Sequence, residues 1–322
     1  MKAVVISSVS QGNEKHTSLS LEERPQPTPQ PGQLVVKVAV SPLQPSDLLN
    51  TQGNFPLTTF PRIPGRDFAG TVVAPADSNW HGKTVAGTSG PVLGFTRDGA
   101  HAEFVVVDEE GVVEVPDDLD VKRVGLLGTP WTTAYLALSR ASPVQNDTVL
   151  VLGASGQVGN AVSQLVKSSL FSCRLLTAGR GDRYDVDSAA DPSLATVLNS
   201  TDGRGPDIVV DTTGDIALQA AGIRNLSVGG RLSRSPNNRG TSAEVDFKEL
   251  YRKEQIIIGT NSVSHDVKSM AGILRKLLPL FKSGELQLPD ISQNSEIQLD
   301  GAVGAYEEMA RGSRKKFVIV NS

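Results

Sequence analysis

The segment Thr148-Val-Leu-Val-Leu-Gly153-Ala-Ser-Gly156-Gln-Val-Gly159 decides the fold of this chain. Its apolar start is too short for a helix and is typical of a buried parallel strand. Three glycines follow at a spacing of three residues, and then comes an apolar stripe of helical period, formed by Val158, Ala161, Val162, Leu165 and Val166. Residues 175–177 offer the next strand. The segment therefore predicts a strand, a glycine turn, a helix and a second strand, which is the repeating unit of a parallel α/β sheet.

The glycine turn is typical of a dinucleotide site. The unpaired N–H groups and the positive dipole end of a helix N-terminus attract a pyrophosphate. Gly153 permits the tight turn, Gly156 lets a phosphate approach bare backbone, and Gly159 lets the helix pack close to the strand. A turn without a ligand would show the same glycines, but the strand and helix around them favour the dinucleotide. The residues predicted to contact it in this loop are Gly153, Ser155, Gly156, Gln157, Val158 and Gly159.

Length and composition narrow the class of protein. The 322 residues suffice for two domains with separate cores. The net charge of -4 gives no basic surface, so nucleic acid is not expected as a partner. The single cysteine, Cys173, excludes a disulfide framework and an all-cysteine metal site. No apolar stretch reaches the length of a membrane span or of a signal peptide, so we expect a cytoplasmic protein that does not enter a membrane.

The predicted secondary structure changes near residue 118. Before it, short apolar or alternating segments separated by proline and glycine predict a β-rich domain, with an extended proline-rich connector at 25–32. A helical pattern at 129–141 leads into the second part. From there strands and helices alternate, which predicts a doubly wound parallel sheet, and residues 317–320 form a last strand.

These segments together resemble the medium-chain dehydrogenase/reductase superfamily over nearly the whole chain. The matching pieces are Pro45-Ser-Asp47, Ile63-Pro-Gly65, Asp98-Gly-Ala-His-Ala-Glu103, Leu127-Gly-Thr129, the Gly153 to Gly159 loop, Val210-Asp-Thr-Thr-Gly214 and Gly229-Gly-Arg-Leu232. The resemblance implies an α/β protein with a GroES-like β-barrel domain over 1–118, to which the tail 295–322 returns. It also implies a Rossmann domain over 119–294, with a doubly wound sheet of six parallel strands.

The zinc ligands of some relatives are missing from this chain. The family's three catalytic ligand positions correspond to Gln44, to Arg66 and to the neighbourhood of Gly128 and Thr129. A catalytic zinc needs three ligands from Cys, His, Asp or Glu, and Arg66 would bring a fixed positive charge instead. None of the four histidines pairs with another at i, i+4. We predict no metal, and the chain is similar to the zinc-free branch of quinone oxidoreductases and enoyl-thioester reductases.

The end of the second strand predicts which coenzyme binds. Sites that select NAD place an acidic residue about 20 residues past the last glycine, where it binds the ribose hydroxyls. Here the stretch Thr177-Ala-Gly-Arg180-Gly-Asp-Arg183-Tyr184 carries two arginines, which suit a 2′-phosphate. The alternative is that both arginines are solvated loop charges, one of them balanced by Asp182. We predict NADPH, bound by Arg180, Arg183 and Tyr184.

The remaining site residues come from the resemblance. In similar enoyl-thioester reductases a tyrosine that assists protonation follows Gly-Asn, and here the residue is Phe55, which has no proton to give and is expected in the pocket wall. Gln44 and Thr133 are the catalytic candidates, and Gln44 replaces an asparagine that contacts the nicotinamide end. Trp131 is expected either in the substrate pocket or in domain packing. The further residues expected near the coenzyme are Thr129, Gly214, Thr260 and Asn261.

These features predict an NADPH-dependent, zinc-independent reductase that transfers hydride to an activated C=C bond or a quinone. One alternative is a trans-acting enoyl reductase for a carrier-bound acyl thioester. Another is a cofactor-binding protein recruited to a non-redox role, because a fold does not fix a function. The resemblance also predicts a homodimer through a strand at 255–259, although a buried central strand would have the same sequence pattern.

Overall fold

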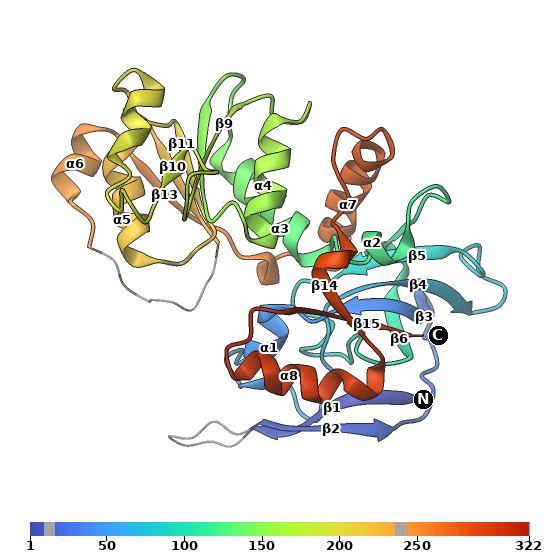
Figure 1. The fold of residues 1–322 in the computed structure, drawn as a ribbon. Coiled ribbons are helices and arrows are strands. Elements are labelled where there is room, and N and C mark those ends of the chain that lie inside the picture. The colour runs from blue at the N-terminus through green and yellow to red at the C-terminus, as the bar shows by residue number, and fades with distance from the viewer. Residues whose placement is uncertain (10–16, 236–241, 243, 322) are drawn as a thin grey trace. The chain divides into compact units, whose positions relative to one another are not determined.

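The structure, a computed structural model, describes residues 1–9, 17–235, 242 and 244–321. It divides into two compact units (Figure 1). The first comprises Met1–Thr129 and Val263–Ser322, and the second comprises Pro130–Ser262. The predicted α/β class with a GroES-like domain and a parallel Rossmann-like sheet is confirmed. The boundaries differ from those predicted, because residues 119–129 and 263–294 lie in the first unit and not with the parallel sheet.

Two sheets, antiparallel except for the parallel pair of β14 and β15, form the framework of the first unit. One is a two-stranded sheet, and the other has seven strands in the order β14-β15-β3-β4-β5-β7 with β6 paired to β3. Strand β15 pairs with β3, so the tail of the chain lies in this unit. The bounds are β1 Lys2–Val9, β2 Thr17–Glu23, β3 Gln33–Pro42, β4 Asp67–Ala74, β5 Thr84–Thr88, β6 Phe104–Asp108, β7 Val112–Glu114, β14 Asn294–Ile297 and β15 Lys316–Val320.

Helix α7 (Val267–Lys282) lies in the first unit, whereas the predicted boundary at residue 294 placed it with the parallel sheet. Its stripe of Met270, Ile273, Leu274, Leu277 and Phe281 is buried, as the periodicity predicts. This face packs on β5 and β7 of the first unit. An apolar stripe does not specify which sheet it covers, so the helix can be predicted from its period but its domain cannot. The other helices of the unit are α1 Pro45–Thr51, α2 Val121–Val124 and α8 Ala302–Ala310, while α7 spans Val267–Lys282.

The second unit contains a six-stranded parallel sheet in the order β10-β9-β8-β11-β12-β13. This is the strand order of doubly wound dinucleotide-binding folds, in which the order of the strands reverses between the first and fourth strands, here the parallel neighbours β8 and β11. The bounds are β8 Thr148–Leu152, β9 Arg174–Gly179, β10 Val186–Asp187, β11 Ile208–Asp211, β12 Arg231–Arg234 and β13 Ile256–Gly259; α4 Gln157–Lys167, α5 Ile216–Asn225 and α6 Phe247–Arg252. Strand β8 is buried at every residue, and the predicted apolar stripe of α4 is buried except for Val158, which is half-buried.

Helix α3 (Gly128–Ala141) begins in the first unit and continues in the second. The 3-10 helices are η1 Glu109–Gly111, η2 Ala195–Thr201, η3 Ser262–Ser264, η4 Ile291–Gln293 and η5 Leu299–Gly301. Over the part of the chain that the structure describes, no helix combines the length and apolarity that a membrane crossing requires.

Candidate functional site

The glycine loop lies where the strand order reverses. Strand β8 ends at Leu152, and Gly153 follows in the left-handed region with φ +82°. The Thr212 hydroxyl, just after β11, donates to the carbonyl of Leu152 at 2.7 Å and ties the two strand ends together. Ligands of open parallel sheets bind outside the carboxyl ends of the strands at this reversal. The loop therefore stands at the expected position for a coenzyme.

The second and third glycines of the loop have different environments. A Cβ atom on Gly159 would come within 2.1 Å of the Gly153 carbonyl oxygen, so helix packing demands glycine there. A Cβ atom on Gly156 would meet nothing closer than 3.4 Å, and its φ of -73° suits any residue. Gly156 is exposed and is the N-cap of α4. The fold itself does not require glycine at 156, and the missing side chain leaves room for an anion at the start of α4.

The arginines after β9 face solvent. Arg180 and Arg183 are exposed, and the Arg183 guanidinium stacks over the Tyr184 ring at 4.9 Å. Two acidic residues nearby already accept main-chain N–H groups, since Asp185 binds Thr177 and Asp187 binds Gly181. The stretch thus presents two cations at the strand end, while these two carboxylates are engaged within the protein.

The other predicted residues of the second unit differ in exposure. Gly214 follows β11 in the chain, has φ +64° and donates its N–H to the carboxylate of Asp211, the last residue of that strand. Asn261 is exposed. Thr260 is buried, and its hydroxyl forms a hydrogen bond with that of Ser233 at 3.1 Å. The side chain of Thr260 is therefore engaged within the sheet, whereas the prediction placed it near the coenzyme. On α3, Trp131 and Thr133 are both buried.

In the first unit, Gln44 is the N-cap of α1 and is 2% exposed. Its side-chain Nε2 donates to the Asp67 carboxylate at 3.0 Å, and its main-chain N–H donates to Asp47 at 2.9 Å. The predicted residue Thr129 binds the same Asp67 carboxylate through its main-chain N–H and its hydroxyl. The structure therefore brings Gln44 and Thr129 together on one acidic residue that the sequence reasoning did not single out.

A buried cation and two phenyl rings lie in the same unit. The Arg66 guanidinium is 2% exposed, donates to the Ser89 carbonyl at 2.8 Å and lies 5.5 Å from the centre of the Phe95 ring. Phe55, which is half-buried, contacts Phe95 edge to face with ring centres 5.1 Å apart. Phe55 therefore packs in an aromatic pair with Phe95. The Phe95 ring also contacts the positively charged guanidinium of Arg66.

The acidic side chain of Asp47 is fully buried in this cluster. Burial raises the pKa of Asp47 to about 7, against a smaller lowering effect of its hydrogen bond from the Gln44 N–H. The charge of Asp67 raises it further and that of Arg66 lowers it. A carboxyl group of this kind exchanges its proton near neutral pH. The sequence signal for it is the Pro45-Ser-Asp47 motif, which by itself indicates only the family resemblance.

Within the described residues, no group of three or more His, Cys, Asp or Glu side chains is arranged to hold a metal ion. Of the predicted ligand positions, Gln44 and Thr129 bind Asp67, and Arg66 contributes a cation. The positions that correspond to zinc ligands therefore hold two side chains engaged with Asp67 and one guanidinium group.

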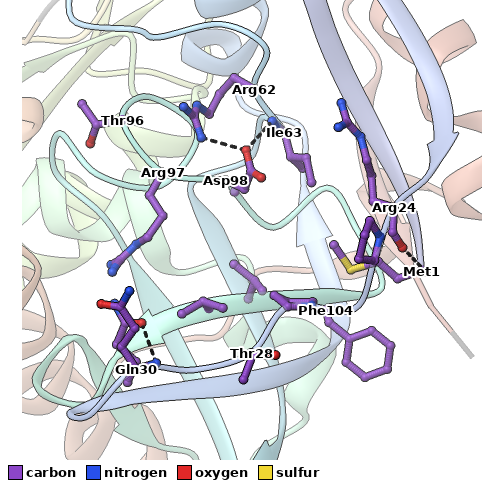
Figure 2. A pocket seen from close by; sticks show the side chains of 16 residues that line it. Met1, Arg24, Thr28, Gln30, Arg62, Ile63, Thr96, Arg97, Asp98 and Phe104 are labelled. Carbon is purple, nitrogen blue, oxygen red and sulfur yellow. Dashed lines mark hydrogen bonds and ion pairs between the residues drawn. The ribbon is translucent and has the colours of Figure 1, made fainter.

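A separate cavity of about 500 Å³ lies in the first unit between the proline-rich connector, β6 and the 96–99 loop (Figure 2). Three arginines are in its wall, and each is held by an acid: Arg24 by Glu22, Arg62 by Asp98 and Arg97 by Asp108. None of the predicted site residues lines this cavity. Because its cations are already paired, it has no free charge for a ligand.

Comparisons with known proteins agree with this architecture. The family model of the alcohol dehydrogenase GroES-like domain matches residues 30–117. The zinc-type alcohol dehydrogenase-like protein C337.11 of Schizosaccharomyces pombe is 36% identical over 306 residues, which cover 94% of this chain and 93% of that protein. Human quinone oxidoreductase is 28% identical over 305 residues, covering 89% of this chain and 88% of its own.

Among solved structures, an alcohol dehydrogenase superfamily protein from Novosphingobium aromaticivorans has a TM-score of 0.84 at 24% identity, and the match covers 100% of both chains. This similarity concerns the fold. Together with the glycine loop, the strand order and the identity to the yeast protein, it establishes the family. The chain belongs to the medium-chain dehydrogenase/reductase superfamily of oxidoreductases, in its quinone oxidoreductase branch.

Proposed function

We propose that this protein is an NADPH-dependent reductase that transfers hydride, without a metal, to an activated C=C bond or to a quinone. The observation that carries the proposal is the exposed start of α4, located where the strand order reverses, together with two exposed arginines at the end of β9. The first feature suits a pyrophosphate and the second suits a 2′-phosphate.

The residues of the second unit fit such a coenzyme. Gln157 and Val158 are the first two residues of α4, whose N–H groups have no carbonyl partner within the helix, and Ser155 is exposed just before them. Arg180 and Arg183 would pair with the phosphate on the adenosine ribose. Bound in this way, NADPH would supply the hydride from its nicotinamide ring. The contribution of the protein is to hold and orient it.

The chemistry of the side chains supports a metal-free reaction. A catalytic zinc takes three protein ligands, whereas this chain has an amide at Gln44 and a guanidinium at Arg66. The lone pairs of Asp67 are already used by four donors. The name of the yeast relative refers to the zinc type. Elemental analysis of the purified protein tests the point, because stoichiometric zinc would contradict a metal-free reaction.

The identity of residue 55 bears on the substrate. Hydride addition to a C=C bond leaves a carbanion that must be protonated or stabilised, and Phe55 cannot donate a proton. Loss of a positioned general acid typically costs 10²–10⁴ in rate. An enone or a quinone needs less help than an acyl thioester, because its reduced form is stabilised by delocalisation. The missing hydroxyl at Phe55 therefore favours this substrate class over carrier-bound thioesters.

The proposal is tested by titrating the protein with NADPH and NADH and then by following NADPH oxidation with a panel of quinones, enones and enoyl thioesters. We expect tighter binding of NADPH and oxidation with quinones or enones. Reaction with thioesters alone would instead favour the enoyl reductase. Binding without oxidation of any substrate would favour the non-redox role, and absence of binding to both coenzymes would refute the proposal.

We also infer a homodimer formed through β13. This strand is the last in the sheet, and Ile256 and Ile257 are 52% and 43% exposed. The nearby helix α6 exposes Phe247 and Tyr251 by 78% and 77%. An open strand edge beside exposed apolar side chains is the kind of surface that two identical sheets use to pair about a two-fold axis.

A further inference from the structure

The Asp67 carboxylate is the centre of a buried hydrogen-bond network in the first unit. It is fully buried and accepts four hydrogen bonds. One oxygen accepts from Gln44 Nε2 at 3.0 Å and from the Thr129 N–H at 2.9 Å. The other accepts from the Thr88 hydroxyl at 2.5 Å and from the Thr129 hydroxyl at 2.8 Å. The donors come from three separate segments, because Gln44 caps α1, Thr88 ends β5 and Thr129 lies in the first turn of α3.

The carboxylate also lies directly at the start of α3. A Cβ atom on Gly128 would come within 2.4 Å of Asp67 Cγ and Oδ1, so the first residue of the helix has no room for a side chain. The helix has 14 residues, and its positive dipole end favours a negative charge at this position. Four donors without a competing acceptor suit the ionised form of Asp67.

This environment fixes the side-chain amide of Gln44. An ionised carboxylate can only accept, so Gln44 must turn its NH₂ group, and not its carbonyl oxygen, toward Asp67. Its main-chain N–H is fixed in addition by Asp47 at 2.9 Å. Gln44 is therefore held by two acidic residues, one on its backbone and one on its side chain, and a reversed amide would place two oxygens against each other.

We propose that Asp67 is a positioning residue for the reductase, which sets the amide orientation of Gln44 and the first turn of α3 at Thr129. This inference rests on the proposed function, because Gln44 and Thr129 are the residues of the first unit expected to meet the nicotinamide end. The competing explanation is that Asp67 only stabilises the fold. The two explanations predict different responses to exchanging an acceptor for a donor at residue 67.

The first test is Asp67→Asn, which keeps the shape of the side chain but turns one acceptor into a donor. The new NH₂ group can face the Thr88 and Thr129 hydroxyls, which can accept, so Gln44 keeps a hydrogen bond but loses its charged acceptor. We expect kcat/KM with NADPH to fall roughly 10-fold. The matched control is Ser41→Ala, which removes a buried hydrogen bond to the main-chain carbonyl of Asp67 but leaves the carboxylate untouched. The control should lower Tm while kcat/KM changes less than about twofold.

The second test is the exchange Gln44→Glu with Asp67→Asn, which restores a charged hydrogen bond between the two residues with donor and acceptor reversed. A positioning role predicts that the exchange recovers part of the Tm lost in the single variant but not its kcat/KM. Recovery of kcat/KM together with Tm would overturn the proposal, because activity would then not depend on which of the two residues presents the amide. Equal losses of kcat/KM in Asp67→Asn and Ser41→Ala, or no loss in Asp67→Asn, would also overturn it.

A readout without coenzyme separates this inference from the proposed function. In protein labelled at the glutamine side-chain amide, the Gln44 NH₂ group should exchange slowly with solvent and should exchange faster in Asp67→Asn, where its acceptor is no longer charged. Rapid exchange in the unaltered protein would overturn the assigned orientation, whatever the coenzyme. If the unaltered protein shows the protection but binds no NADPH, the proposed function fails while the orientation of Gln44 stands.

Discussion

The hydroxyl of Tyr306 donates a hydrogen bond to His101 Nδ1 at 2.8 Å inside the first unit, where both side chains are buried. The other ring nitrogen of His101 lies 3.3 Å from the Pro42 carbonyl. Since that nitrogen must donate to the carbonyl, Nδ1 is the acceptor of a neutral ring. Burial lowers the pKa of His101 to about 4, which agrees with a neutral imidazole. The pair connects α8 to the end of β3.

Replacing Tyr306 with phenylalanine should therefore destabilise the protein. The change leaves Nδ1 of His101 buried without a donor, and such a loss costs about 1–3 kcal/mol of unfolding free energy. Urea denaturation of the two proteins measures the difference. The matched control is Tyr251→Phe, because Tyr251 is 77% exposed and its hydroxyl is free to bind water. An equal effect of the two substitutions would show that the Tyr306 hydroxyl contributes nothing specific.

The stability of the protein should depend on pH through Asp47. Its pKa is 3.8 in an unperturbed chain and about 7 in the fold, mainly because of burial. As pH rises from about 4 to about 7, the unfolded chain loses this proton while the folded protein keeps it, so the contribution of Asp47 to stability falls. Below this window the contribution is fully present, and above it the loss is complete.

The variant Asp47→Asn removes this dependence and keeps an acceptor for the Gln44 N–H. Relative to the unaltered protein, the unfolding free energy of the variant should therefore rise across the same window, by a total on the order of 4 kcal/mol. Denaturation at several pH values measures the difference curve. The charges of Arg66 and Asp67 remain in both proteins. A difference between variant and parent that does not change with pH would contradict the raised pKa.

The preference for NADPH should depend on Arg180 and Arg183. Replacing both with alanine removes the charged hydrogen bonds to the 2′-phosphate, so the Kd for NADPH should rise roughly 10- to 100-fold while the Kd for NADH changes less than about twofold. Fluorescence titration with each coenzyme measures both constants. The control is Arg204→Ala, an exposed arginine elsewhere in the second unit. A parallel weakening of both coenzymes would mean that the arginines do not distinguish them.

The parts of the structure that sequence predicts well are those set by neighbouring residues. The strand, turn and helix at 148–167 follow from a local apolar run, the glycine spacing and a helical stripe, and the fold confirms all three. The Asp67 network could not be found in this way, because its donors Gln44, Thr88 and Thr129 are 23, 21 and 62 positions away in the chain. The pair of His101 and Tyr306 spans 205 positions.

Domain membership is likewise a long-range property. The stripe of α7 predicts a helix that covers a sheet, but two sheets were available, and the sequence-based boundary assigned it to the wrong one. Arg180 and Arg183 can be named from the sequence, yet the freedom of their charges depends on Asp185 and Asp187 being occupied by main-chain N–H groups. Hydrogen-bond partners of this kind leave no periodic signal in a sequence.

The homodimer can be tested at the edge of the sheet. A charge at Ile257, as in Ile257→Lys, should block strand pairing along β13 and convert a dimer into a monomer at micromolar concentration. Analytical ultracentrifugation measures the mass. Val144→Lys is the control, because Val144 is 63% exposed in the same unit but lies between α3 and β8. Monomers in the unaltered protein, or a dimer that survives the lysine at 257, would argue against this interface.

The two glycines at the start of α4 should separate coenzyme binding from stability. In Gly156→Ala the new Cβ atom has no neighbour closer than 3.4 Å, so Tm should change little, but the methyl group occupies the side from which a phosphate approaches. We expect the Kd for NADPH to rise by at least about tenfold, since one good phosphate contact is worth about 1.5–3 kcal/mol. Titration and thermal denaturation of the same sample measure both quantities.

Gly159→Ala should behave in the opposite sense. Its Cβ atom would come within 2.1 Å of the Gly153 carbonyl oxygen, so the helix must move away from the strand and the fold should lose about 1–3 kcal/mol. Coenzyme affinity should fall as well, because the loop that holds the phosphate is displaced. Each variant adds one methyl group, and the two positions are three residues apart. If Gly156→Ala retains full NADPH affinity with an unchanged Tm, the pyrophosphate does not bind at the start of α4, and the site proposed for the coenzyme is wrong.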